Sequence, residues 1–172
     1  MELAEFCRNF KRFADGFGTK VVNEIQRDPD EFVTYIHQQL YSGRDGNERL
    51  LSPTYLDDPY FETPESGRWF KKPRWYMGWK THITPPTPAY IGLPARPREV
   101  PNLIIRGDFY SSITALPIQG GLRITTQGVS FGPSIEKKYG SAIFKVGKHA
   151  VKEFVDAHLL RAIESYYKSL GL

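Results

Sequence analysis

The tightest group of acidic side chains in the sequence is Asp57, Asp58 and Glu62. Paired carboxylates can perform general acid–base catalysis or hold a divalent cation. Adjacent aspartates in an Asp-Asp-Pro-Tyr stretch more often accept hydrogen bonds from the backbone that follows them. We therefore expect a structural turn, and an acid–base enzyme that uses these carboxylates is kept as an alternative.

Histidine and cysteine side chains show no pattern that favours a metal or a nucleophile. The four histidines are His37, His82, His149 and His158, and no pair has the spacing of metal ligands. The single cysteine, Cys7, lies beside Phe6 and Phe10 on the apolar side of an expected helix, which predicts a buried structural thiol. No serine-nucleophile elbow and no glycine-rich phosphate loop with its lysine is present. The sequence predicts no catalytic residue, no metal and no cofactor.

The most distinctive segment is residues 68–80, which contains all three tryptophans and five basic side chains. Basic groups bind phosphates and aromatic rings stack on bases, so this segment is a candidate nucleic-acid-binding module. The possible DNA contacts are Arg68, Lys71, Lys72, Arg74 and Lys80. The interpretation that we favour is that the tryptophans pack in the core or at a subunit interface while the lysines extend to water.

The amino-acid composition limits the possible class of protein further. The chain has 172 residues, of which 40% are hydrophobic, enough for one domain with a sizeable core. It contains no apolar run long enough for a membrane helix. The net charge of +4 is mild for a dedicated nucleic-acid binder. Aromatic residues make up 14%, and such residues are enriched at protein interfaces, so the composition favours assembly.

In the N-terminal half, apolar spacing predicts an amphipathic helix over residues 2–15 that Gly16 and Gly18 interrupt. A second helix is expected from Pro29 to Gly43, capped by Asp28. Residues 43–63 should form a loop, and a helix that opens at Pro64 should be kinked or ended by Pro73.

Six prolines between Pro85 and Pro101 predict an extended arm that lies on the surface or reaches a neighbour. Together with the tryptophans, this arm supplies the expected interface anchors. These anchors are Trp69, Trp75, Trp79, Pro85, Pro86, Pro88, Tyr90, Pro94 and Pro97.

The C-terminal half has a different sequence pattern, which predicts short strands and helices. Leu103–Ile105 is a strand candidate, and Asp108 should cap a short helix over Phe109–Ile113. Residues 116–118 and 122–126 flank Gln119-Gly120-Gly121 and predict a β-hairpin. Helices are expected at 134–139 and 148–169.

The expected fold class is α+β, with a small antiparallel β-sheet packed against a long C-terminal helix. N-terminal helices and the extended proline-rich arm complete a single domain over residues 1–172. Residues 1–43 hold the N-terminal helices. Residues 44–101 hold the loop, the Trp-rich helix and the arm, and residues 102–172 hold the sheet and the C-terminal helix.

Several blocks, in order, carry a family resemblance. They are Gln39-Leu40-Tyr41-Ser42-Gly43, Leu51-Ser52-Pro53-Thr54-Tyr55, Asp57-Asp58-Pro59-Tyr60-Phe61, Trp79-Lys80, Ile83-Thr84-Pro85, the run from Val100 to Ile113, Lys138-Tyr139-Gly140 and Ile143-Phe144. This order resembles small virion proteins of tailed bacteriophages of Bacteroides-type hosts, including crAss-like phages. Those proteins are similar to the neck, or tail-completion, proteins that join the capsid portal to the tail.

The resemblance implies a structural virion protein, made in the host cytoplasm, that forms a ring in the phage neck or tail. Its partners would be further copies of itself, in a ring of about 12 or 6, and the portal or other neck and tail ring proteins. The genome would pass through the lumen with non-specific contact, and no membrane would be involved. The Trp-rich and Pro-rich stretch 64–101 departs from the shorter relatives.

Overall fold

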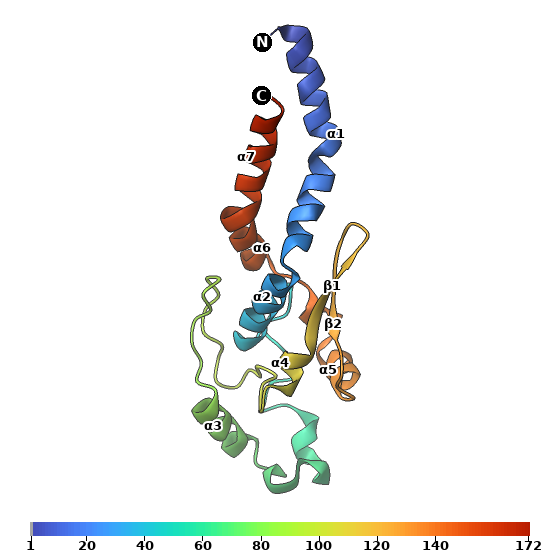
Figure 1. Ribbon diagram of the computed structural model, residues 1–172. Coiled ribbons are helices and arrows are strands. Elements are labelled where there is room, and N and C mark those ends of the chain that lie inside the picture. Colours follow the sequence, from blue (N-terminus) through green and yellow to red (C-terminus); the bar gives the residue numbers. More distant parts are fainter. Residues whose placement is uncertain (1) are drawn as a thin grey trace.

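The computed structural model describes residues 2–172 and has an α+β fold, as predicted (Figure 1). Its helices are α1 (Leu3–Arg27), α2 (Pro29–Tyr41), α3 (Pro73–Ile83), α4 (Asp108–Ser112), α5 (Gly132–Tyr139), α6 (Lys148–Phe154) and α7 (Leu160–Ser169). The molecule is elongated. The antiparallel helices α1 and α7 form one end, α2 and the hairpin lie in the middle, and α3 lies at the other end (Figure 1).

Helix α1 is continuous through both glycines, so the predicted interruption at Gly16 and Gly18 is wrong. Tertiary packing on α7 outweighs the helix cost of glycine, about 1 kcal/mol each. The ring of Phe13 stacks on Tyr166 of α7 at 5.4 Å between centroids, and the Tyr166 hydroxyl donates to the backbone oxygen of Arg12 at 3.0 Å. Gly16 faces the same tyrosine, and a Cβ there would overlap the hydroxyl.

Helix α2 passes through the core of the molecule. It begins at Pro29 as predicted, although the Asp28 side chain makes no capping hydrogen bond. Ile36 and Leu40 are fully buried and belong to one hydrophobic cluster. The buried amide of Gln39 donates to the oxygen of Lys145 at 3.1 Å and accepts from the nitrogen of Gly147 at 3.0 Å. These two bonds fix the chain that leads into α6.

The predicted β-hairpin is confirmed. Strands β1 (Ile113–Ile118) and β2 (Gly121–Thr126) pair antiparallel, with Ile118 opposite Gly121 across a two-residue turn. Leu122 and Ile124 of β2 pack with Phe154 of α6 in a second hydrophobic cluster, which places the C-terminal helix against the sheet. That helix runs continuously over 148–169, with an unpredicted π-helical turn at Val155–Leu159.

Residues 103–105 do not form the expected strand. Leu103 takes a left-handed conformation (φ 57°), and the Asn102 side chain accepts from the Ile104 nitrogen at 3.3 Å, which makes a tight turn. Asp108 begins α4 instead of capping it, because the cap position belongs to Gly107 with φ 95°. Helix α5 agrees with its prediction and ends at Gly140.

Pro73 starts α3 and neither kinks nor ends a preceding helix. The helix expected after Pro64 is a short 3₁₀ segment, Pro64–Trp69, that is broken at Gly67. Another 3₁₀ turn, Pro59–Glu62, precedes it, and a third lies at Ser141–Phe144. Proline is well suited to the first helical position, where its missing N–H is no loss.

Residues 85–101 contain turns but neither helix nor strand, as predicted. They are not a free arm. Ala89, Ile91 and Leu93 are buried in the cluster that contains Phe32 and Tyr35 of α2. Apolar side chains between the prolines therefore fold the segment back onto its own chain. The predicted anchors Pro85, Pro88, Tyr90 and Pro94 are exposed, and Pro86 and Pro97 are half-buried.

Candidate interaction surfaces

An aromatic cluster holds the lower end of the molecule together. The Tyr76 ring lies at its centre, with centroids 5.0–5.5 Å from those of Tyr55, Phe61, Trp69 and Trp79. Aromatic pairs at such separations add roughly 1 kcal/mol each beyond the area that they bury. Trp69 and Trp79 are half-buried in this cluster, so their main role is packing.

Trp75 is the tryptophan that projects into solvent, with 75% of its surface exposed. It lies one residue after Arg74, on the side of α3 that bounds a shallow hollow with Trp69, Gly78 and Trp79. An exposed indole beside a guanidinium offers a stacking face next to a cation.

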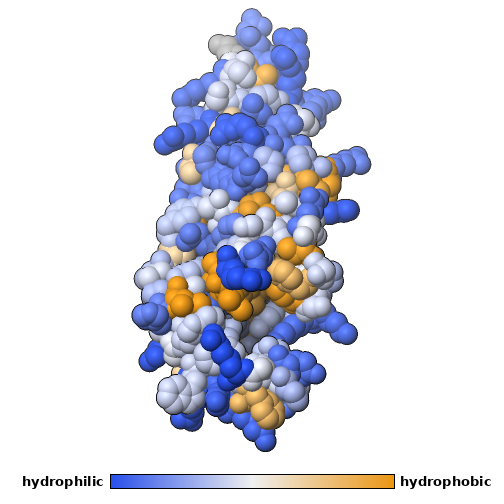
Figure 2. Space-filling model, turned by 60° about the horizontal axis from the view of Figure 1, so that its bottom comes forward, coloured by the Kyte–Doolittle hydropathy of each residue, from blue (hydrophilic) through white to orange (hydrophobic). Residues whose placement is uncertain are grey.

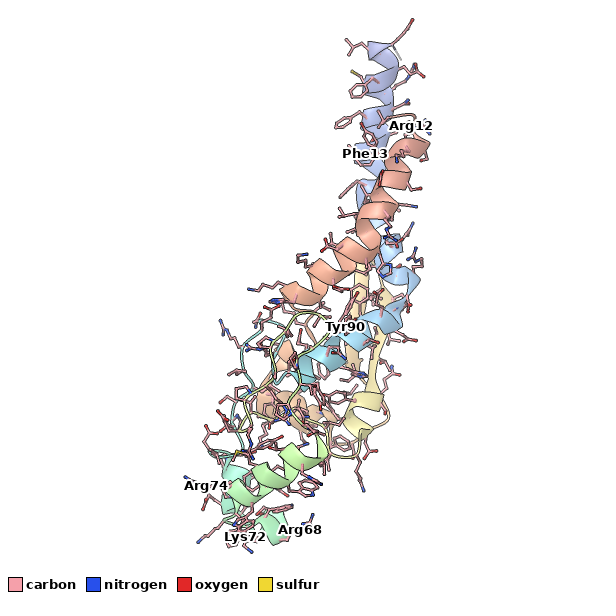
Figure 3. The ribbon with its side chains drawn as sticks, turned by 90° about the vertical axis from the view of Figure 1, so that its left-hand side faces the viewer. Arg12, Phe13, Arg68, Lys72, Arg74 and Tyr90 are labelled. Atoms are coloured by element: carbon pink, nitrogen blue, oxygen red, sulfur yellow. The ribbon has the colours of Figure 1, made fainter. Side chains whose placement is uncertain are left out.

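The basic side chains of residues 68–80 have different environments. Arg68, Lys71, Lys72 and Arg74 are exposed at the end of the molecule opposite Arg12 and Phe13 (Figure 3). The Arg68 guanidinium lies 4.5 Å from the centre of the Trp69 ring.

Lys80 has a different environment: it is 1% exposed, and its ammonium donates to the backbone oxygen of Ile104. Its assignment as a DNA contact is therefore wrong. The other four basic side chains remain candidate DNA contacts.

Helix α1 carries an apolar row that the sequence analysis treated only as helix periodicity. Leu3, Phe6, Phe10 and Phe17 are 78%, 38%, 50% and 42% exposed. Phe6 and Phe10 stack at 6.0 Å between centroids. The spacing of 3 and 4 residues along this row is the signal that predicts a helix–helix seam.

The first turns of α1 extend past the end of α7, where Gly171 lies beside Asn9, and this leaves Leu3 and Phe6 uncovered (Figures 1 and 3). Phe13 contacts Tyr166 and Tyr167, the last aromatic residues of α7. Cys7 lies on the uncovered part and is exposed, so the prediction of a buried thiol is wrong. Its environment lacks the second helix that burial would need.

The acidic group forms a structural turn, as predicted. Asp58 accepts from the Tyr60 nitrogen at 3.0 Å and pairs with Lys138. Asp57 accepts from the Thr54 hydroxyl at 2.5 Å, and this hydrogen bond lowers the pKa of Asp57. The carboxylates are thus held by separate local partners, and Glu62 is exposed.

The histidines are dispersed. His37 shares a hydrogen bond of 2.9 Å with the oxygen of Tyr110, and burial lowers the pKa of His37. His149 pairs with Glu48 at 2.7 Å, and His158 pairs with Glu31 at 2.8 Å. His82 is exposed. Within residues 2–172, no three His, Cys, Asp or Glu side chains gather as a metal site would require.

A cavity of about 280 Å³ opens between α3, α5 and the turn at 103–105. Aromatic and aliphatic side chains dominate its walls, among them Tyr55, Phe61, Tyr76, Ile104 and Tyr139, and Lys80 also lines it. A more open hollow of about 750 Å³ adjoins it and shares Leu103, Ile105 and Ile135. In Figure 2, hydrophobic residues gather in a band across the lower half of the view.

Two buried cations lie close together beside this cavity. Arg96 is 2% exposed and donates to the oxygens of Val100 (3.0 Å) and Thr84 (2.6 Å). Burial lowers the pKa of Lys80 to about 8, and the Arg96 charge adds to the effect. No local sequence signal marks this pair, because the two residues meet only through the fold.

Among residues 2–172, no helix is both long enough and apolar enough to cross a membrane. Comparison of the chain with protein-family models, curated proteins and solved structures finds no match. Function is therefore inferred from the surfaces of the molecule itself and from the sequence blocks described above.

Proposed function

We propose that this protein is a structural subunit of a ring in the neck or tail of a tailed bacteriophage, where the ring connects the portal to the tail and lines the DNA path. The ordered sequence blocks that resemble neck and tail-completion proteins support this assignment. The ring would contain about 12 or 6 copies, located in the virion and bound to the portal or to other ring proteins.

The observation that carries the proposal is the uncovered apolar row of α1. Leu3, Phe6 and Phe10 are exposed on the first turns of the helix, and Leu3 and Phe6 precede Asn9, which lies beside Gly171 at the end of α7. Contiguous exposed aromatic side chains on one helix face mark an interaction surface, because their burial against a partner is favourable.

The two ends of the molecule differ in chemistry, which suits a ring. The α1 end presents apolar rings, and the α3 end presents Trp75 with basic side chains (Figure 3). A ring needs head-to-tail contacts between unlike surfaces. An elongated subunit with unlike surfaces at its two ends meets this requirement.

Assembly can be tested with the purified protein by mass photometry and negative-stain electron microscopy over a range of concentrations. We expect closed rings from the natural sequence and monomers from the double variant Phe6→Ser, Phe10→Ser, because both rings are exposed and their loss leaves the core intact. Leu56→Ser is the matched control, since Leu56 is 46% exposed elsewhere.

A natural protein that stays monomeric at every concentration, and that is also absent from purified virions by quantitative mass spectrometry, would contradict the proposal. Presence in virions at a ratio to the portal protein of about one or one half, as expected of matching or halved ring symmetry, supports it.

The exposed Trp75 beside Arg74 favours one alternative, a nucleic-acid-binding module. That function predicts binding to single-stranded DNA that weakens steeply with salt and that Trp75→Ala reduces about 5- to 150-fold, as expected from the loss of roughly 1–3 kcal/mol of stacking. Phe131→Ala, at a ring that is 40% exposed on α5's N-terminal side, is the control. A connector subunit alone should bind such DNA weakly and without dependence on Trp75.

A further inference from the structure

The cavity beside α3 combines apolar walls with an incompletely compensated positive charge. Lys80 lines it and is 1% exposed, and its ammonium donates to the backbone oxygen of Ile104, which lines the same cavity. The ion pairs among residues 2–172 include neither Lys80 nor Arg96. Buried charges are ordinarily paired with an opposite charge, so an acidic partner is the missing element.

A second polar group in the wall is incompletely satisfied. Tyr55 is 6% exposed, and although the backbone of Asn102 lies beside its hydroxyl, the hydroxyl donates no hydrogen bond within the described part of the chain. A buried O–H donor without an acceptor costs roughly 1–3 kcal/mol. An anionic oxygen that enters the cavity would offer an acceptor to this hydroxyl and a counter-charge to Lys80.

The backbone around the cavity is arranged in a costly way. Leu103 takes the left-handed conformation (φ 57°) that L side chains avoid, and the turn it makes brings the Ile104 oxygen onto Lys80. Asp58, the acidic residue among those that line the cavity, is already paired with Lys138. The Asp58 carboxylate therefore does not neutralise the charge of Lys80.

We propose that this cavity binds an apolar carboxylate, with the carboxylate against Lys80 and the hydrophobic body between Phe61, Tyr76, Tyr139 and Ile104. A volume of about 280 Å³ holds one ring or a short alkyl chain. Two sources supply this chemistry, a free aryl or alkyl acid and a peptide that ends in an apolar residue. None of the residues that line the cavity belongs to the α1 row, so the variant Phe6→Ser, Phe10→Ser leaves the lining intact.

Isothermal titration calorimetry of the full chain tests the site with three probes: 4-phenylbutyrate, its neutral amide 4-phenylbutyramide, and the dipeptide acetyl-Ala-Phe with a free carboxylate. We expect at least one carboxylate to bind and the amide to bind at least tenfold more weakly. Tighter binding of the free acid identifies a small-molecule source, and tighter binding of the dipeptide identifies a peptide source.

Variants locate the binding. Lys80→Met should weaken carboxylate binding at least tenfold, whereas Lys137→Met, at an exposed lysine of α5 outside the cavity lining, should leave it unchanged. Circular dichroism of both variants checks that they are folded. Equal binding of acid and amide, no binding of either carboxylate, or full binding by Lys80→Met overturns the proposal.

Dependence on pH provides an independent readout. Arg96 acts on Lys80 from beside the cavity, and the charged or titratable groups that line the cavity with Lys80 are Asp58, Lys138 and Tyr60, together with three further tyrosines, Tyr55, Tyr76 and Tyr139. Burial raises the pKa of each of these three tyrosines, to about 12 for Tyr55, so the tyrosines stay neutral below pH 9. Affinity for 4-phenylbutyrate should fall as pH rises through about 8, where Lys80 loses its proton, and Lys80→Met should show no such fall.

Discussion

Lys80 is a buried charge that lowers the stability of the folded state. Because burial favours the neutral amine, its folded-state pKa is lowered from 10.5 to about 8. Between these two values the unfolded chain binds more protons than the folded one, so stability rises with pH in this window. Below pH 8 both states are protonated, and the full cost of the buried charge, about 3 kcal/mol, is present.

We predict that Lys80→Met raises the free energy of unfolding at pH 7 by about 1–3 kcal/mol, because a buried charge is replaced by an apolar chain of similar length. The variant also loses the hydrogen bond to the Ile104 oxygen, and this loss offsets about 1 kcal/mol of the gain in stability. Urea denaturation at pH 7, 8 and 9 measures the effect, and the advantage of the variant should shrink as pH rises.

Lys137→Met serves as the control here too and should change stability by less than about 0.5 kcal/mol at each pH. A Lys80→Met protein less stable than the natural one at pH 7 would show that the ammonium is well compensated in the folded state.

At the scale of elements, two glycines of α1 make a matched pair. Gly16 faces Tyr166, whereas a Cβ on Gly18 would meet nothing within 4 Å. Gly18→Ala should therefore stabilise the protein by roughly 0.5–1 kcal/mol through helix propensity. Gly16→Ala should destabilise it by roughly 1–3 kcal/mol, because the ring that stacks on Phe13 must move.

Thermal unfolding followed by circular dichroism distinguishes the two, with the melting temperature rising for Gly18→Ala and falling for Gly16→Ala. Two changes of the same sign and size would mean that α1 and α7 do not pack as closely as described.

Elements with local signals were predictable from the sequence. Pro29 marks the start of α2, and Gln119-Gly120 marks the hairpin turn. The predictions that were wrong depend on contacts between segments that are distant in the sequence. The continuity of α1 depends on Tyr166, and the burial of Lys80 depends on Ile104. Local propensity contains no information about either partner.

The candidate interaction surfaces were also predictable only where the signal is local to the sequence. The composition of residues 68–80 drew attention to the α3 end of the molecule, but it could not separate the exposed Trp75 from the packed Trp69 and Trp79. Which ring faces solvent is decided by the cluster around Tyr76, whose members Tyr55 and Phe61 come from the preceding loop.

At the scale of the whole molecule, the two ends should respond oppositely to salt. Contacts through Phe6 and Phe10 are apolar and should persist or strengthen as sodium chloride rises, whereas DNA contacts through Lys72 and Arg74 should weaken. Mass photometry and fluorescence anisotropy across one salt series measure both. Rings that dissociate as salt rises would indicate an ionic interface instead.

The π-helical turn at Val155–Leu159 has a consequence for how one helix serves two parts of the molecule. Phe154 packs on Phe32 in the core, and Tyr166, twelve positions later, packs on Phe13 of α1. In a regular α-helix, at about 100° per residue, these side chains would point about 120° apart. The wider turn absorbs one residue and brings them within about 20° of a common direction. The turn therefore sets the phase of the helix, so that one continuous helix contacts both the compact middle and the projecting end of the molecule.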